Sequence, residues 1–280
     1  MKKNWIMRRL KMQCSRTVED IINFLQPDVE WVDYGNTRDQ LLLGNRNFSA
    51  NKIMVCWVAT TKLIELAVRE KYDMIVTHEN FLYTESTKYQ EVICRNREYK
   101  KKLLQESNIS VYRCHDLWDL FPKIGVKDKW IETITANKQV IKRKDMDFYS
   151  FIEFERAIEF KALAQNIAQE IKDESQNGIQ IIGDFRTKIK KVGIGTGAIT
   201  NVAEMLRYSD VDCLVVTDDG INNWVDVQLA MDSEINLIIV NHYTSEARGI
   251  ACLAEYLQHG LKDIWVRYFP LNYQISYVEE

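Results

Sequence analysis

The stretch KIMVCWVATTKLIELAVREKYDMIVTHE, residues 52–79, indicates the fold class. Short apolar runs alternate here, and on to residue 114, with longer segments that are typical of helices. The predicted elements are a strand at 52–58, a helix at 60–70, a strand at 73–77, a helix at 88–106 and a strand at 109–114. This βαβαβ order predicts parallel strands joined by crossover helices, so we expect an α/β protein with helices on the faces of its sheet.

A second βαβαβ succession occupies the C-terminal part of the chain. Its predicted elements are strands at 189–195, 212–217 and 235–241 and helices at 200–209 and 222–231, closed by a helix at 244–259 and a strand at 263–269. Lys52 and Lys191 open corresponding strands, and Thr61 and Thr200 start the helices that follow. The pattern predicts duplicated, mainly parallel halves, although any two βαβ units look similar and that alternative stays open.

The middle of the chain, residues 127–188, is predicted to be a helical connecting segment, with helices at 127–138 and 153–175. Apolar residues recur at helical spacing in the second of these helices. They are Ala157, Phe160, Leu163, Ala164, Ile167 and Ile171. We expect this stripe to be core or subunit interface. The predicted organisation is a first α/β half at 1–126, the connecting segment, and a second α/β half at 189–280 that completes the same site.

Composition narrows the classes of protein that the chain can belong to. Its 280 residues, 46% hydrophobic and 28% charged, are ordinary for a globular protein, and a net charge of −3 offers no case for nucleic acid. No run approaches the roughly 20 apolar residues that cross a bilayer, so no membrane is expected. The six cysteines are scattered without a Cys-x-x-Cys pair, which argues against a disulfide framework and fits a reducing cytoplasm.

Three of the four histidines stand directly after predicted strands. They are His78, His115 and His242, and each has a carboxylate within four residues. Ligands of open α/β sheets bind beyond the carboxyl ends of the strands, so these side chains are expected to converge. A lone histidine is more often a structural residue, but three at matching places favour a metal site. The number of carboxylates suggests room for two ions.

The stretch NHYTSE, residues 241–246, is the most informative of these strand ends. Thr244 or Ser245 is expected to cap the next helix, which would place Glu246 in its first turn near His242. An imidazole and a carboxylate that can bridge two ions suit metal-assisted hydrolysis. The alternative is that Glu246 only stabilises the helix N-terminus, and the stretch alone does not decide between them.

The glycine-rich turn at 193–197, GIGTG, follows a predicted strand and precedes a helix. Its small residues would let backbone amides approach an anion at the helix N-terminus. It lacks the G-x-G-x-x-G pattern of dinucleotide-binding proteins. A tight structural turn and a phosphate contact therefore both remain open.

Four stretches, taken in order, resemble one known family. They are VATTKLIELA at 58–67, DMIVTHEN at 73–80, YRCHDLWD at 112–119 and IVNHYTSE at 239–246. In these motifs the chain is similar to the Ngg-one-interacting-factor-three-like dinuclear metal proteins, also catalogued as GTP cyclohydrolase type-two homologues. The resemblance covers about residues 17–125 and 189–269. It implies a duplicated α/β fold and a homo-oligomer, with a ring-shaped hexamer as the first expectation.

The resemblance also implies a ligand set for one or two divalent ions of unassigned identity, Zn, Fe, Mn or Mg. The implied metal ligands are His78, Glu79, Asp119, His242 and Glu246. His115 matches the motif histidine and is expected to be a neighbour of the ions. Glu79 and Asn80 replace the family's usual His-Pro, and a carboxylate in place of an imidazole shifts the preference toward harder ions than Zn.

The leading functional hypothesis is a metal-dependent hydrolase acting on a nucleotide or another phosphorylated small molecule. The ions would lower the pKa of bound water, and His115 or Asp116 would transfer protons. The alternative is a non-catalytic metal-holding oligomeric scaffold or regulatory binding protein. A third hypothesis, a nucleotide-binding α/β protein without metal, would need the turn at 193–197 to hold the ligand.

Overall fold

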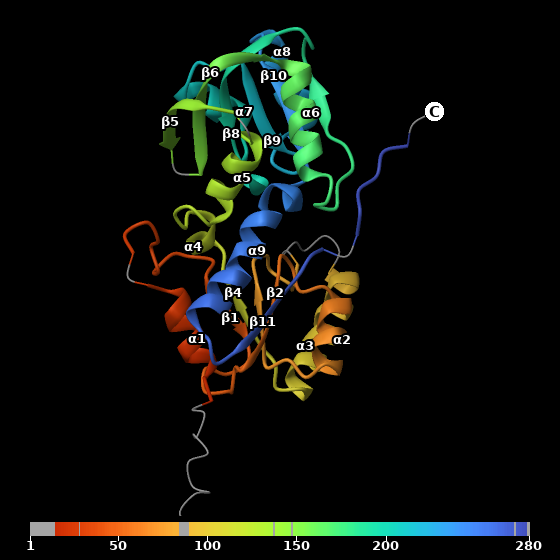
Figure 1. Ribbon diagram of the computed structural model, residues 1–280. Helices are drawn as coiled ribbons and strands as arrows, with labels where there is room; N and C mark the ends of the chain where they lie inside the picture. The colour runs from red at the N-terminus through yellow and green to blue at the C-terminus, as the bar shows by residue number, and fades with distance from the viewer. Residues whose placement is uncertain are drawn as a thin grey trace, which may run out of the picture.

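The computed structural model of the chain describes residues 15–27, 29–83, 90–136, 138–146, 148–271 and 273–278. It contains two sheets (Figure 1), each with parallel strands at its centre. Helices cover both faces of each sheet. The α/β fold class predicted from the sequence is therefore confirmed. Within the described residues, no helix is long and apolar enough to cross a membrane.

The first sheet has the strand order β1-β4-β3-β2-β11. Its strands are β1 (Gln40–Leu43), β2 (Lys52–Cys56), β3 (Met74–Thr77), β4 (Ser110–Arg113) and β11 (Trp265–Phe269). Neighbouring strands are parallel except β1, which is antiparallel to β4. Alternate side chains point to opposite faces, so Ile53 and Val55 join one core while Met54 and Cys56 join the other. The first core lies under α1 (Val18–Leu25) and the second under α2 (Thr61–Arg69) and α3 (Gln90–Glu106).

The second sheet has the order β5-β6-β8-β9-β10-β7. Its strands are β5 (Val140–Met146), β6 (Tyr149–Glu159), β7 (Gln180–Ile182), β8 (Lys188–Ile194), β9 (Cys213–Thr217) and β10 (Asn236–Val240). The parallel strands are β8, β9 and β10. One face packs on α5 (Val126–Ile134) and α6 (Phe160–Ile171), and the other on α7 (Val202–Tyr208) and α8 (Asn223–Asp232).

Helix α9 (His242–Gly260) joins the two sheets. It starts directly after β10 of the second sheet, and Figure 1 shows it running down to the first sheet, where Ile250, Leu253 and Leu257 are buried in the core. Gly249 lets it cross α5 closely, because a Cβ there would lie 2.6 Å from the Cα of Val126. The first turn of α9 is thereby fixed between the two sheets.

Two parts of the sequence prediction were wrong. The helix predicted at 153–175 begins only at Phe160, because residues up to 159 belong to the hairpin β5–β6, and Ala157 is exposed on β6. The rest of the apolar stripe, on α6, is buried inside the chain, so of the two expected roles it is core and supplies no subunit interface. The predicted strand at 263–269 is β11, which pairs with β2 of the first sheet instead of closing the second half.

Both sheets share one topological detail. The strand that precedes the parallel set, β1 in one sheet and β7 in the other, lies antiparallel at the far edge, beside β4 and β10 respectively. The shared arrangement favours the duplication, which stays a prediction.

Candidate metal centre

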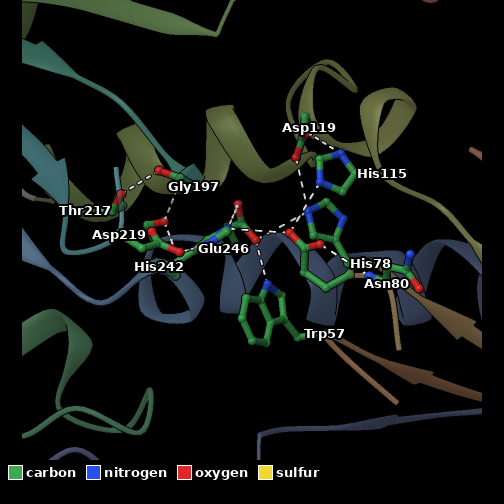
Figure 2. A network of polar contacts seen from close by, with 12 residues as sticks. Trp57, His78, Asn80, His115, Asp119, Gly197, Thr217, Asp219, His242 and Glu246 are labelled. Carbon is green, nitrogen blue, oxygen red and sulfur yellow. Dashed lines mark hydrogen bonds and ion pairs between the residues drawn. The ribbon is translucent and has the colours of Figure 1, made fainter. Parts of the chain in front are cut away.

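The three strand-end histidines meet where the two sheets face each other across the first turn of α9 (Figure 2). His78 follows β3, His115 follows β4 and precedes the short helix α4 (Asp116–Asp119), and His242 begins α9. Glu246 lies one turn further along α9, on the same face as His242. The convergence expected from the sequence is therefore present in the structure.

The start of α9 differs from the prediction. Asn241 is the residue before the helix, and no side chain caps it. Ser245 donates its hydroxyl hydrogen to the carbonyl of His242 at 2.7 Å, inside the helix. The helix thus begins two residues earlier than expected, and neither Thr244 nor Ser245 caps it.

His78 is fully buried and held in one orientation. Its Nδ1 donates to the carbonyl of Cys114 at 3.0 Å, since a carbonyl oxygen only accepts. Its Nε2 lies 3.3 Å from Asp119 Oδ1 and 3.3 Å from Glu246 Oε2. Both His78 Nε2 and Asp119 Oδ1 are buried without a hydrogen-bond partner. Burial opposes the charged form, but the Glu246 and Asp119 carboxylates raise the pKa of His78 to about 9.

His115 stacks on His78, with ring centroids 4.3 Å apart and planes 5° from parallel. Its Nδ1 lies 3.0 Å from both Asp116 Oδ1 and Asp119 Oδ2. Although burial opposes the charged form, these carboxylates hold the pKa of His115 well above its usual value. Its Nε2 lies 3.4 Å from Glu79 Oε1. His115 is therefore surrounded by carboxylates and is placed to hold a proton.

Glu79 forms an ion pair that the sequence analysis did not foresee. Arg113 Nη2 lies 2.9 Å from Glu79 Oε2, and Arg113 Nε donates to the carbonyl of His78 at 3.0 Å. The other oxygen, Glu79 Oε1, lies 3.7 Å from His242 Nε2. Burial alone would raise the pKa of Glu79, but the hydrogen bond to His115 and the charge of His78 lower it to about 2.

His242 has a carboxylate oxygen at each ring nitrogen. Nδ1 lies 2.8 Å from Asp219 Oδ2, and Nε2 lies 3.0 Å from Glu246 Oε1. Burial opposes its charged form, yet these carboxylates raise the pKa of His242 to about 11. The second oxygen of Glu246, Oε2, accepts a hydrogen bond of 2.6 Å from the Trp57 indole. Both oxygens of the buried Glu246 carboxylate are therefore oriented.

Asp116 lies beside the cluster and makes many contacts of its own. It accepts hydrogen bonds from the backbone and guanidinium of Arg38, at 2.8 and 3.1 Å, and from the Thr37 hydroxyl at 3.0 Å. The nearby Asp39 accepts from the amides of His115 and Leu117. These contacts fix the turn that presents His115 and Asp119.

A cavity of about 220 Å³ opens beside the cluster. Arg38, Arg113 and Gly197 line it together with Glu79, His115, Asp119, His242 and Glu246. Gly197 has φ +61°, and a Cβ there would lie 2.9 Å from Glu246 Oε1. Its amide donates to Ser245 Oγ at 3.4 Å, and that of Gly195 donates to Val215 O. The glycine-rich turn thus forms one wall of the cavity, and the amides of Gly195 and Gly197 already donate hydrogen bonds within the protein.

The donor set suits a divalent ion. Two groups have ligand atoms within 4.8 Å of one another: His78 with His115 and Asp119, and His78 with Glu79 and Glu246. Neighbouring ligands of a tetrahedral ion with bonds of ~2.0–2.2 Å lie about 3.3–3.6 Å apart, which matches both contacts of His78 Nε2. The unpartnered His78 Nε2 and Asp119 Oδ1 would be satisfied by an ion between them.

The site residues that lie at strand ends could be predicted from the sequence, but the residues that form hydrogen bonds and ion pairs with them were not predicted. The residues missed are Arg38, Asp39, Trp57, Arg113 and Asp219. Asp219 alone had a signal, because it follows β9 as Glu79 follows β3. The others come from inside a strand or from loops, where nothing in the sequence indicates which way a side chain points.

Comparisons with known proteins relate the chain to one family. A family model described as Duf34/NIF3 (NGG1p interacting factor 3) matches residues 16–273. A curated relative from Clostridium acetobutylicum, named GTP cyclohydrolase 1 type 2 homolog, is 24% identical over 260 residues, covering 88% of this chain and 91% of that protein.

Solved structures with the same fold are also known. A Bacillus cereus protein related to NIF3 aligns with a TM-score of 0.73 at 11% identity, covering 94% of this chain and all (100%) of that chain. A hypothetical protein from Staphylococcus aureus aligns with a TM-score of 0.71 at 16% identity, covering 94% and 100%. At these identities the solved structures show a shared fold.

Proposed function

The chain belongs to the Duf34/NIF3 family, and on this premise we propose that it is a metal-dependent hydrolase. The observation that carries the proposal is the pair of buried, unpartnered atoms, His78 Nε2 and Asp119 Oδ1, beside an open cavity. Buried polar atoms are normally paired, and an exception in a native fold calls for an ion or another partner. The adjacent cavity leaves room for a substrate next to that ion.

The proposed metal ligands fall into two positions that share Glu246. His78, Asp119 and Glu246 surround the first, and Glu79, His242 and Glu246 surround the second. The site would hold one or two divalent ions, Zn, Fe, Mn or Mg. Three of the five ligands are carboxylates, and each position has a single imidazole, which favours harder ions over Zn.

When bound, an ion would lower the pKa of a coordinated water toward neutrality and so supply a nucleophile. The protein's own part is proton transfer and orientation. His115 lines the cavity and is the proposed proton carrier, and Asp116 holds its Nδ1 at 3.0 Å. Asp116 does not line the cavity, so its proposed part is to orient His115 and supply it with negative charge.

The proposed substrate is a nucleotide or another phosphorylated small molecule. Its support is the pair of guanidinium groups, Arg38 and Arg113, that line the cavity beside the cluster. Guanidinium groups bind phosphate oxygens with paired hydrogen bonds. The cavity of about 220 Å³ suits the phosphate end of such a molecule.

The test is a hydrolysis assay on the full chain. Protein stripped of metal and reloaded with Mn²⁺ is offered GTP, other nucleotides and simple phosphate monoesters, and product release is followed. We expect turnover that requires metal and is lost in Glu246→Gln but kept in His259→Gln, whose side chain is exposed at the far end of α9. Metal binding without turnover of any of these compounds would favour the non-catalytic scaffold or regulatory protein instead.

We also propose that the chain forms a homo-oligomer, with a hexamer as the first expectation, in a reducing cytoplasm. The support for an interface is a group of exposed apolar side chains on α8, Trp224, Val225 and Met231. The scattered cysteines, which include no Cys-x-x-Cys pair, support such a compartment. Light scattering should give a multiple of the monomer mass, and Trp224→Glu should lower it.

A further inference from the structure

We infer that the Arg113 guanidinium takes the place of a second cation, so that this chain holds a single divalent ion, between His78, Asp119 and Glu246. The inference rests on the proposed metal site and concerns how many ions it holds. It follows from a difference between the two positions that share Glu246.

The first position has donors that lack partners. His78 Nε2 and Asp119 Oδ1 are buried without a hydrogen-bond partner, and each contact of His78 Nε2 to a carboxylate oxygen is 3.3 Å long. His78 is 0% exposed and Asp119 7%, so water has little access to replace the missing partner. An ion is the group that completes this position.

The second position has donors that are already paired within the protein. His242 Nε2 is hydrogen-bonded to Glu246 Oε1 at 3.0 Å, and its Nδ1 to Asp219 Oδ2 at 2.8 Å. Glu79 Oε2 accepts from Arg113 at 2.9 Å and from the amide of Asn80 at 3.3 Å. An ion entering here would have to displace the contact between His242 and Glu246 in order to bind.

Arg113 adds a fixed positive charge at this position. Its side chain is only 12% exposed, and it is anchored twice, to the Glu79 carboxylate and to the carbonyl of His78. The guanidinium therefore neutralises Glu79, the carboxylate that faces His242 Nε2 at 3.7 Å across the second position. A divalent ion bound to Glu79 Oε1 would stand next to this charge in a poorly solvated site, where repulsion between like charges is strong.

Arg113 also keeps a donor free for substrate. Among the described residues, its Nη1 has no hydrogen-bond or ion-pair partner, and Arg113 lines the cavity. A guanidinium donor beside a metal ion can bind an anionic oxygen much as a second ion would. The same side chain thus excludes the second ion and supplies the cationic group that an anionic substrate needs.

The experiment counts ions. Full-length chain is stripped with a chelator and dialysed against rising Mn²⁺, and bound metal per chain is measured by mass spectrometry. We expect one ion in the wild type and in Arg113→Lys, which keeps the charge. Arg113→Gln should bind a second ion at least about tenfold more tightly than the wild type does. Arg156→Gln, at an arginine whose side chain is 92% exposed on β6, serves as the control and should behave as the wild type.

The outcomes separate this inference from the proposed metal site. Two ions of similar affinity in the wild type would overturn the inference and leave the metal site standing, and so would a folded Arg113→Gln that still binds one. No ion in the wild type would overturn both. The number of ions bound by the wild type decides the matter even if Arg113→Gln does not fold.

A second measurement tests anion binding by Arg113. With one equivalent of Mn²⁺ bound, inorganic phosphate should bind about tenfold more weakly to Arg113→Gln than to Arg156→Gln. Equal binding would show that Arg113 has no role in anion recognition.

Discussion

The two ends of the metal centre satisfy their polar atoms in different ways. At the His78 end the ring is buried, its Nδ1 is bound to a carbonyl, and its Nε2 faces carboxylates without a hydrogen bond. At the His242 end both ring nitrogens are hydrogen-bonded to carboxylates, and Asp219 is half exposed to solvent. A buried group without a partner costs about 1–3 kcal/mol. When the His78 ring is neutral, the fold therefore bears a cost at this end that an ion would remove, and no such cost at the His242 end.

The largest expected effect comes from removing the two imidazoles in turn. His78→Ala should abolish ion binding, because it removes the imidazole that faces both Asp119 and Glu246 at the first position. His242→Ala should leave one ion bound, since the hydrogen bonds it breaks are to Asp219 and Glu246. Bound metal after dialysis against Mn²⁺ is the measurement.

Exposed His259 provides the control, and His259→Ala should bind metal as the wild type does. If His242→Ala loses the ion as completely as His78→Ala, the claim that the ion binds at the His78 end alone is wrong.

A smaller effect is expected from Trp57→Phe. The indole donates to Glu246 Oε2 at 2.6 Å, and this oxygen is the one 3.3 Å from His78 Nε2. Removing a group that orients a metal ligand typically lowers affinity about 10–100-fold. Calorimetric titration with Mn²⁺ measures the change, and an unaltered affinity would show that Glu246 does not bind the ion through this oxygen.

The stability of the metal-bound protein and that of the metal-free protein should depend differently on pH. The folded pKa of His78, about 9, lies above its ordinary value of 6.5. In the metal-free protein, the contacts of charged His78 with its carboxylates therefore stabilise the fold. This contribution is complete below pH 6.5 and is lost as the pH rises through about 9. A bound ion needs the neutral ring, so metal binding releases this proton and weakens about tenfold for each unit that the pH falls below 9.

Thermal unfolding at pH 6 and pH 9, with and without Mn²⁺, measures this linkage. The gain in melting temperature on adding Mn²⁺ should be larger at pH 9. A gain that is equal at the two values would mean that the ion does not bind at His78.

The smallest expected effect is that of Asp219→Asn. Asp219 contacts His242 and is 51% exposed, so the pair is worth at most about 1 kcal/mol of folding stability. The ion count should not change, and Mn²⁺ affinity should stay within about threefold of the wild type. A loss of tenfold or more in a calorimetric titration would show that His242 is a ligand whose orientation Asp219 maintains.

The sequence predicted well what depends on strand ends. The buried strands β3 and β10 are largely apolar, and a histidine follows each, His78 directly and His242 after Asn241, so both could be placed at one edge. The i, i+4 spacing on a helix then placed Glu246 beside His242. The residues that set the charge of the site were beyond this reasoning. Arg113 ends the short strand β4 and Trp57 follows β2, and only tertiary packing turns their side chains toward the cluster.

The wrong element assignments have a physical cause as well. The strand β5 was missed because residues 141–145 are exposed on an edge strand and four of the five are charged, so the alternation that marks a half-buried strand is missing. The helix predicted from residue 153 starts at Phe160, because Phe154 is buried with the β6 face while Ala157 faces solvent. Sheet membership of β11 could not be predicted, since only the long helix α9 carries the chain back to the first sheet.

The most direct test of the central claim is the anomalous diffraction of crystals grown with Mn²⁺. We expect one strong peak per chain, within about 2.0–2.4 Å of His78 Nε2 and of oxygens from Asp119 and Glu246. Arg113 should remain in contact with Glu79, as in the ion pair of 2.9 Å described here. A second peak of comparable height between Glu79 and His242, with Arg113 turned away, would contradict it.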